Sequence, residues 1–235
     1  MLDAEFLTLL GLGLVLGLRH ALDTDHLAAV STVLAQRPSL RASGMIGLSW
    51  GLGHTVVLLS VGAVVLVLRV QIPEPFVLAT EFGVGAMLVL LGGMLGMRLL
   101  RERWHLHRHD HDGEHHVHLH SHALLENHRH GHWWRDSVRP FCIGMAHGLA
   151  GSAALLLIVL SSAQSVVEGL TYIAVFGLGS IMGMMLVGIA VSLPVLWSLS
   201  LGRPVFLAVQ GLASLGSVAV GFMMMFHIAV GSQHF

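Results

Sequence analysis

The chain has 235 residues, of which 54% are hydrophobic and only 11% are charged, and its mean hydropathy is +0.77. Soluble domains average about 25% charged residues, so this composition excludes a water-soluble globular fold. The formal net charge of −1 says nothing about an acidic or basic partner, and no nucleic-acid binding is expected. All 12 basic residues are arginines, and 18 histidines are present. The sequence therefore predicts an all-α polytopic membrane protein with an unusual supply of imidazole.

Apolar runs bounded by Arg, Pro or polar clusters predict about six transmembrane helices. A span needs about 20 apolar residues, because backbone groups in hydrocarbon must bond within their own segment. The expected helices cover residues 5–35, 44–69, 76–100, 138–163, 168–197 and 204–231. The N-terminal stretch MLDAEFLTLL is acidic and has no small-residue cleavage signature, so no removable signal peptide is expected.

The distribution of arginines predicts the orientation in the membrane. Ten arginines follow the first, third and fifth helices, whereas only Arg69 lies in a connection on the opposite side. Arginine-rich loops stay in the cytoplasm, so both termini are expected outside a bacterial or archaeal cytoplasmic (inner) membrane.

The two halves of the chain resemble each other at an offset of about 127 residues. Gly17 and His20 correspond to Gly144 and His147, and the segment 50–54 corresponds to 176–180. Three helices per copy predict a 3+3 inverted repeat, the construction that many transporters use to place a site between their halves. The expected units are a first repeat at 1–100, a His-rich cytoplasmic loop at 101–137 and a second repeat at 138–235.

A cluster of ionisable residues interrupts the first predicted helix. Arg19, His20, Asp23, Asp25 and His26 lie within eight residues, although each costs about 2.5–3.5 kcal/mol at the centre of a spanning helix. They are expected to face protein, water or an ion. On a regular helix the two histidines are about 9 Å apart. Either the helix is unwound there, or they serve successive sites or support one another.

The types of side chain narrow the expected ion. Imidazole and carboxylate without thiolate suit Ni(II), Co(II) or Zn(II), and Cys142 as the only cysteine excludes a disulfide or a thiolate cage within the chain. His54 and His147, in the second and fourth helices, are candidates for the same cavity. The alternatives are that Arg19 neutralises an aspartate and that His54 bonds a carbonyl of a neighbouring helix.

A polar, His-rich segment separates the two predicted repeats. Such a composition is typical of weak metal binding at several sites, which requires neutral imidazole and should fall below about pH 6. We expect this loop to act as a metal buffer or sensor; a solvated loop without specific binding is the alternative. Its twelve candidate auxiliary ligands are His105, His107, His109, His111, His115, His116, His118, His120, His122, His128, His130 and His132.

The segment from Leu18 to Ala29 resembles the signature of the nickel/cobalt transporter (NiCoT) family, in which a His is followed after four residues by Asp-His. The segment from Leu52 to Val57 resembles the family's next motif. Gly144 to Ala154 is similar to the shorter, six-helix branch that is associated with urease accessory genes. The resemblance implies that His20, Asp23, Asp25, His26 and His54 govern metal selection and passage. It also implies a metallochaperone for urease or hydrogenase as a partner.

We therefore expect a secondary transporter, not an enzyme, that moves Ni2+ or Co2+ without a permanently bound cofactor. Uptake is the leading direction, and efflux through the same site is the alternative. A hypothesis of another class is an intramembrane hydrolase, with Ser152 and His227 as nucleophile and base or with a metal-activated water, although Gly-x-Ser-x-Gly is absent around Ser152 and the sequence has no His-Glu-x-x-His. A third is a membrane protein that binds metal without transporting it.

Overall fold

The computed structural model describes residues 4–36, 38–102, 107–111, 114–118, 133–163 and 165–231. Helices dominate this part of the chain, as the sequence predicts. Their bounds are α1 Ala4–His20, α2 Thr24–Leu34, α3 Leu40–Leu68, α4 Glu74–Glu102, α5 Trp133–Ser162, α6 Val166–Ser200 and α7 Arg203–Gly231.

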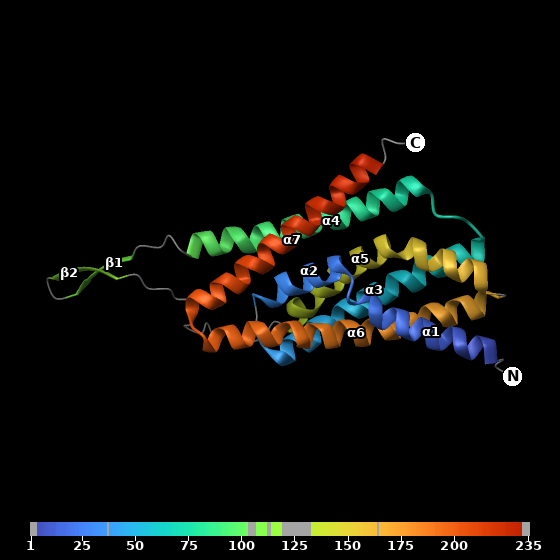
Figure 1. The fold of residues 1–235 in the computed structure, drawn as a ribbon, viewed down its shortest axis with the longest axis horizontal. Coiled ribbons are helices and arrows are strands. Elements are labelled where there is room, and N and C mark those ends of the chain that lie inside the picture. Colours follow the sequence, from blue (N-terminus) through green and yellow to red (C-terminus); the bar gives the residue numbers. More distant parts are fainter. Residues whose placement is uncertain are drawn as a thin grey trace.

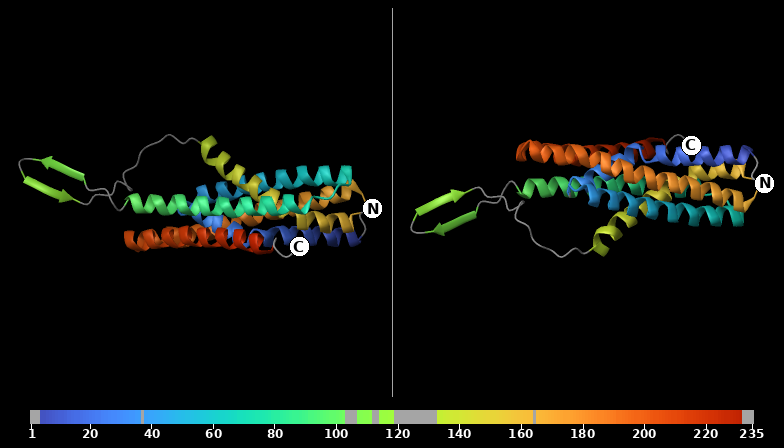
Figure 2. Two further views of the ribbon diagram at one scale, coloured as in Figure 1. Left: turned by 90° about the horizontal axis from the view of Figure 1, so that it is seen from above. Right: turned by 90° about the horizontal axis from the view of Figure 1, so that it is seen from below.

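Successive helices run back and forth along the long axis of the molecule (Figure 1). The connections after α2, α4 and α6 lie towards one end, where a β-hairpin projects beyond the helices (Figure 2). The first turn of α1 lies at the opposite end. The three arginine-rich connections thus share one end of the molecule, and the side of the membrane on which they lie stays a prediction.

Most of the helices are long and apolar enough to cross a membrane. Among the described residues, Leu40–Leu68, Glu74–Arg101, Val166–Ser200 and Arg203–Gly231 qualify singly, and α1 with α2 qualifies as one broken span. The chain is therefore an integral membrane protein by length and composition of its helices. The remaining predicted span, residues 138–163, corresponds to α5, which is not among these segments. The count of six spans therefore stays a prediction.

The first predicted helix is broken at the ionisable cluster, and α1 and α2 are bent by 51° relative to one another. Leu22 N–H donates to Arg19 O at 2.8 Å, and Asp23 N–H donates to His20 O at 3.1 Å, which closes a tight turn. Asp23 has an extended backbone and precedes the first residue of α2. Buried Ala21 sits against Gly183 of α6, where an added Cβ would lie 2.8 Å from the alanine Cβ.

Glycines allow close approach of helix backbones at two equivalent crossings. A Cβ added to Gly17 of α1 would meet the backbone oxygen of Phe176 in α6. One added to Gly144 of α5 would meet the backbone oxygen of Trp50 in α3. Each residue of one contact corresponds to a residue of the other contact at the offset that relates the two halves of the sequence. Small residues at such crossings are typical of packed membrane helices.

Two further pairs of contacts follow the same exchange. Gly53 of α3 approaches the backbone of Phe141, and Gly179 of α6 approaches that of Leu14. At the crossing of α3 with α6, Gly51 packs on Ile181 and Gly177 packs on Thr55. The correspondences found in the sequence are therefore matched by contacts at equivalent positions.

Helices α4 and α7 pack against each other beside the remaining helices (Figure 1). Ser214 Oγ donates to Gly92 O at 2.8 Å, and Ser217 Oγ donates to Leu88 O at 3.0 Å. These buried hydroxyl groups donate hydrogen bonds to carbonyl groups of the neighbouring helix, because buried polar groups need hydrogen-bond partners. Gln210 Nε2 donates to Ala35 O at 2.6 Å, which ties α7 to the end of α2.

The His-rich segment contains a short antiparallel hairpin that the sequence analysis did not predict. Its strands are β1 His107–His111 and β2 Glu114–His118, and their register pairs His107 with His118 and His109 with His116. The intervening sequence, Asp112-Gly113, is typical of two-residue hairpin turns and was the available signal.

Candidate metal site

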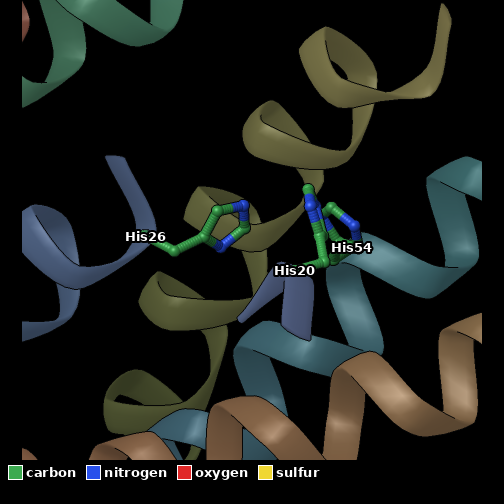
Figure 3. Close-up of side chains that lie close together, drawn as sticks. All are labelled: His20, His26 and His54. Atoms are coloured by element: carbon green, nitrogen blue, oxygen red, sulfur yellow. The ribbon is translucent and has the colours of Figure 1, made fainter. Parts of the chain in front are cut away.

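Three histidines from separate segments converge near the break between α1 and α2. His20 ends α1, His26 lies in the first turns of α2, and His54 lies midway along α3 (Figure 3). Each offers a ring nitrogen, and these nitrogens lie within 4.8 Å of one another. The ring centroids are separated by 4.7 Å for His20–His26, 5.0 Å for His20–His54 and 5.4 Å for His26–His54.

The break is what brings the first two histidines together. A regular helix would separate their backbones by about 9 Å along its axis. The turn and the 51° bend instead bring their rings to 4.7 Å. The structure thus realises local unwinding, which was one of the two alternatives left open by the sequence.

The buried imidazoles have nitrogens without protein partners. His54 is fully buried and His26 is 2% exposed. Neither ring nitrogen of His54, nor Nδ1 of His26, has a hydrogen-bond partner among the described residues. Buried polar atoms are normally satisfied, since an unpaired one costs about 1–3 kcal/mol. This arrangement suits a ligand that binds nitrogen lone pairs, and it does not fit the alternative in which His54 bonds a carbonyl.

Asp23 orients His20. Its Oδ2 lies 2.7 Å from His20 Nδ1. A carboxylate only accepts, so Nδ1 carries the hydrogen and the lone pair of Nε2 is available to an ion. A carboxylate in this position fixes the orientation of a metal-binding imidazole and raises its basicity. This contact does not fit the alternative in which Arg19 neutralises Asp23, because the carboxylate of Asp23 bonds to the ring of His20.

Asp25 and His147 lie beside the three-histidine group. Asp25 Oδ2 is 4.0 Å from His26 Nε2 and 3.9 Å from His147 Nε2. His147 Nδ1 lies 3.2 Å from Ile143 O, and a carbonyl only accepts, so the hydrogen is on Nδ1. The buried Nε2 of His147 therefore presents a lone pair, and it has no hydrogen-bond partner in the described structure. All six residues predicted from the sequence thus lie in one neighbourhood.

Comparison with known proteins decides the family. Residues 6–196 match the family described as NicO, high-affinity nickel-transport protein. The chain belongs to the NicO family. It is also 33% identical, over 185 residues, to the urease accessory protein UreH of Bacillus sp. (strain TB-90), an alignment that covers 78% of this chain and 75% of that relative. No solved structure matches the chain.

Membership of the NicO family confirms the resemblance seen in the sequence and makes the chain a nickel transporter rather than an enzyme. The hydrolase hypothesis is therefore wrong. Ser152 lies in α5, but its side chain falls outside the described part of the structure, and His227 is exposed on α7. The nickel ion is a transported substrate and not a resident cofactor.

Two aromatic residues of the candidate site were missed by the sequence analysis. The ring centroid of Phe176 lies 5.6 Å from that of His20, and that of Trp50 lies 5.1 Å from that of His147. The two pairs correspond through the offset between the halves, since His20 matches His147 and Phe176 matches Trp50. Trp50 precedes His54 by four residues on α3, and this helical spacing was the signal that could have found it.

In the candidate site, the side chains near His20 are partly exposed to solvent, whereas His54 is buried. The side chain of Asp23 is 51% exposed and that of His20 is 19% exposed, whereas His54 and His147 are buried. Gly151 of α5 is exposed, and a Cβ added there would lie 3.7 Å from His20 Nε2. The absent side chain leaves space next to the nitrogen that is available to an ion.

The auxiliary histidines of the loop are only partly within the described structure. His107, His109, His111, His115, His116 and His118 belong to the strands of the hairpin, whereas the other six lie outside the described residues. Binding of metal by this loop stays a prediction.

Proposed function

We propose that the chain takes up Ni2+ or Co2+ through a site formed by His20, His26 and His54, with Asp23 orienting His20 and with Asp25 and His147 beside it. The observation that carries this is the convergence of three imidazoles with ring nitrogens within 4.8 Å, two of them from nearly inaccessible rings. Neutral imidazole suits late first-row divalent ions, and the exposed Cys142 is the only thiol in the chain.

The transport cycle that fits this site alternates its access between the two faces of the membrane. Six spans in a 3+3 inverted repeat would rock about the midplane, where α1 ends and α2 begins. The exchanged contacts of Gly17 with Phe176 and of Gly144 with Trp50 support such a repeat. Negative ends of broken helices attract cations, and the last carbonyls of α1 lie next to His20.

Uptake is favoured over efflux by the likeness to a protein named for urease maturation. A transporter in that role supplies its ion to the cell interior, where a metallochaperone for urease or hydrogenase would receive it. The ten arginines on one side support a topology in which both termini lie outside. The His-rich loop then lies in the cytoplasm as an auxiliary binding segment.

Flux of radiolabelled nickel and cobalt into oriented proteoliposomes, with and without a proton gradient, tests this function. His20→Ala and His26→Ala should abolish flux while the protein still inserts, because each removes a donor that no neighbour replaces. His227→Ala is the matched control, since this histidine is exposed on α7. Wild-type flux in both site variants would refute the assignment. Flux only from the opposite orientation would establish efflux.

A further inference from the structure

His26 stands between two other imidazoles. Its ring centroid lies 4.7 Å from that of His20 and 4.8 Å from that of His147. His20 belongs to α1, whereas His147 belongs to α5, which packs on α3. The central ring is thus placed at nearly equal distances from histidines of the two halves.

A second set of donors meets on one side of His26. Asp25 Oδ2 lies 4.0 Å from His26 Nε2 and 3.9 Å from His147 Nε2. Metal–nitrogen and metal–oxygen bonds of about 2.0–2.2 Å allow two donors of one ion to lie up to about 4.2 Å apart. Each distance is within this limit, so the Asp25 carboxylate can share an ion with either imidazole.

The unpaired Nε2 of His147 indicates room for a ligand between His147 and Asp25. Its side chain is fully buried, its Nδ1–H is held by Ile143 O, and its Nε2 has no hydrogen-bond partner among the described residues. A nitrogen lone pair that is buried, oriented and directed at a carboxylate 3.9 Å away is the arrangement that a cation would complete.

We propose that Asp25, His26 and His147 form a second ion position, distinct from that of His20, His26 and His54 and occupied by the same divalent transition-metal ion during transport. This inference rests on the proposed function. His26 belongs to both positions, and a neutral imidazole has one lone pair, so only one position is filled at a time. Passage of the ion from the first position to the second exchanges His20 and His54 for Asp25 and His147, and His26 serves both positions.

The charges of the two positions are balanced for such a transfer. The first has one carboxylate that acts through a ring, since Asp23 contacts His20. The second has one carboxylate, that of Asp25, next to the ion itself. A cation passes between neighbouring sites when each binds it well enough to admit it and loosely enough to release it. Equal numbers of carboxylates avoid a large difference between the two positions.

The test separates binding from flux. It uses the full-length chain with the twelve loop histidines replaced by asparagine, so that loop binding does not mask the site. Titration with Co2+, followed by its visible absorption in detergent, should give affinities for His147→Ala and Asp25→Asn within about threefold of the parent, whereas His54→Ala should lose at least about tenfold. Nickel flux should fall at least about tenfold in all three variants.

Each outcome decides one question. Binding lost as strongly in His147→Ala as in His54→Ala would show a single site with all donors, and would overturn the second position. Parent-like flux in His147→Ala and Asp25→Asn would overturn it as well. Absence of flux in the parent chain would instead overturn the proposed function. If His147→Ala does not insert, His147→Gln retains a polar group for Ile143 and is judged by the same measurements. His227→Ala is the control for loss of an exposed histidine.

Discussion

Nδ1 of His20 lies 2.7 Å from Oδ2 of Asp23, and this contact bridges the turn that separates α1 from α2. It sets the hydrogen on Nδ1 and leaves Nε2 for the ion. In the proposed site Asp23 is therefore a positioning residue, whose carboxylate would act on nickel through the ring of His20 rather than by direct contact.

Replacement of this carboxylate should weaken nickel binding without removing a ligand. Asp23→Ala is expected to raise the KM for nickel by about 10–100-fold, the usual cost of losing a group that orients a metal-binding imidazole. Asp23→Asn should recover part of this loss, because its amide oxygen still accepts from Nδ1–H. The measurement is initial nickel flux as a function of concentration. Glu81→Gln, on α4, is the control for a lost carboxylate, and parent-like KM in Asp23→Ala would contradict the positioning role.

A methyl group at Gly151 should obstruct the ion. The added Cβ would lie 3.6 Å from Cε1 and 3.7 Å from Nε2 of His20, which is ordinary contact for the ring but occupies space next to the lone pair. We expect Gly151→Ala to insert normally and to lower nickel affinity by about tenfold or more. Gly93→Ala on α4, where nothing lies within 4 Å, makes the same change without a neighbour. Equal affinities in the two variants would show that the ion does not approach His20 from this side.

Much of the fold could be predicted from the sequence because hydropathy acts locally. Five of the six apolar runs each formed one helix close to its predicted bounds, and the first, 5–35, formed the broken pair α1 and α2. The cluster from Arg19 to His26 marked the candidate site because ionisable groups are costly in lipid. The type of ligand followed from the same residues. Those inferences need no knowledge of which helices are neighbours.

The remaining features depend on contacts between distant residues. At the break, Ala21 packs against Gly183, which lies 162 positions further along the chain (183 − 21). The approach of His147 to Asp25 and the tilted ring contact between Trp50 and His147 depend on where α5 lies relative to α2 and α3. No local pattern specifies such packing. The hairpin of the loop differs, since Asp112-Gly113 was a local signal that the abundance of histidines obscured.

The two equivalent helix crossings should respond alike to the same change. A Cβ at Gly17 meets Phe176 O, and one at Gly144 meets Trp50 O, so each alanine must push two backbones apart. We expect Gly17→Ala and Gly144→Ala each to lower the free energy of unfolding by about 1–3 kcal/mol relative to Gly83→Ala, which gains helix propensity without a contact. Thermal unfolding in detergent, followed by tryptophan fluorescence, measures this. A large loss in one variant and none in the other would argue against a symmetric frame.

Deletion of residues 105–132 should separate capture of nickel from its passage. The deletion removes all twelve loop histidines but none of the converging side chains near the break, so the KM for nickel should rise while the maximal rate changes little. Free imidazole protonates near pH 6.5 and binds metal only when neutral. The advantage of the intact chain should therefore be present at pH 7.5 and largely lost at pH 5.5. Nickel flux into proteoliposomes at both pH values checks this, and complete inactivity of the deletion variant would contradict an auxiliary role, because the loop would then be needed for passage itself.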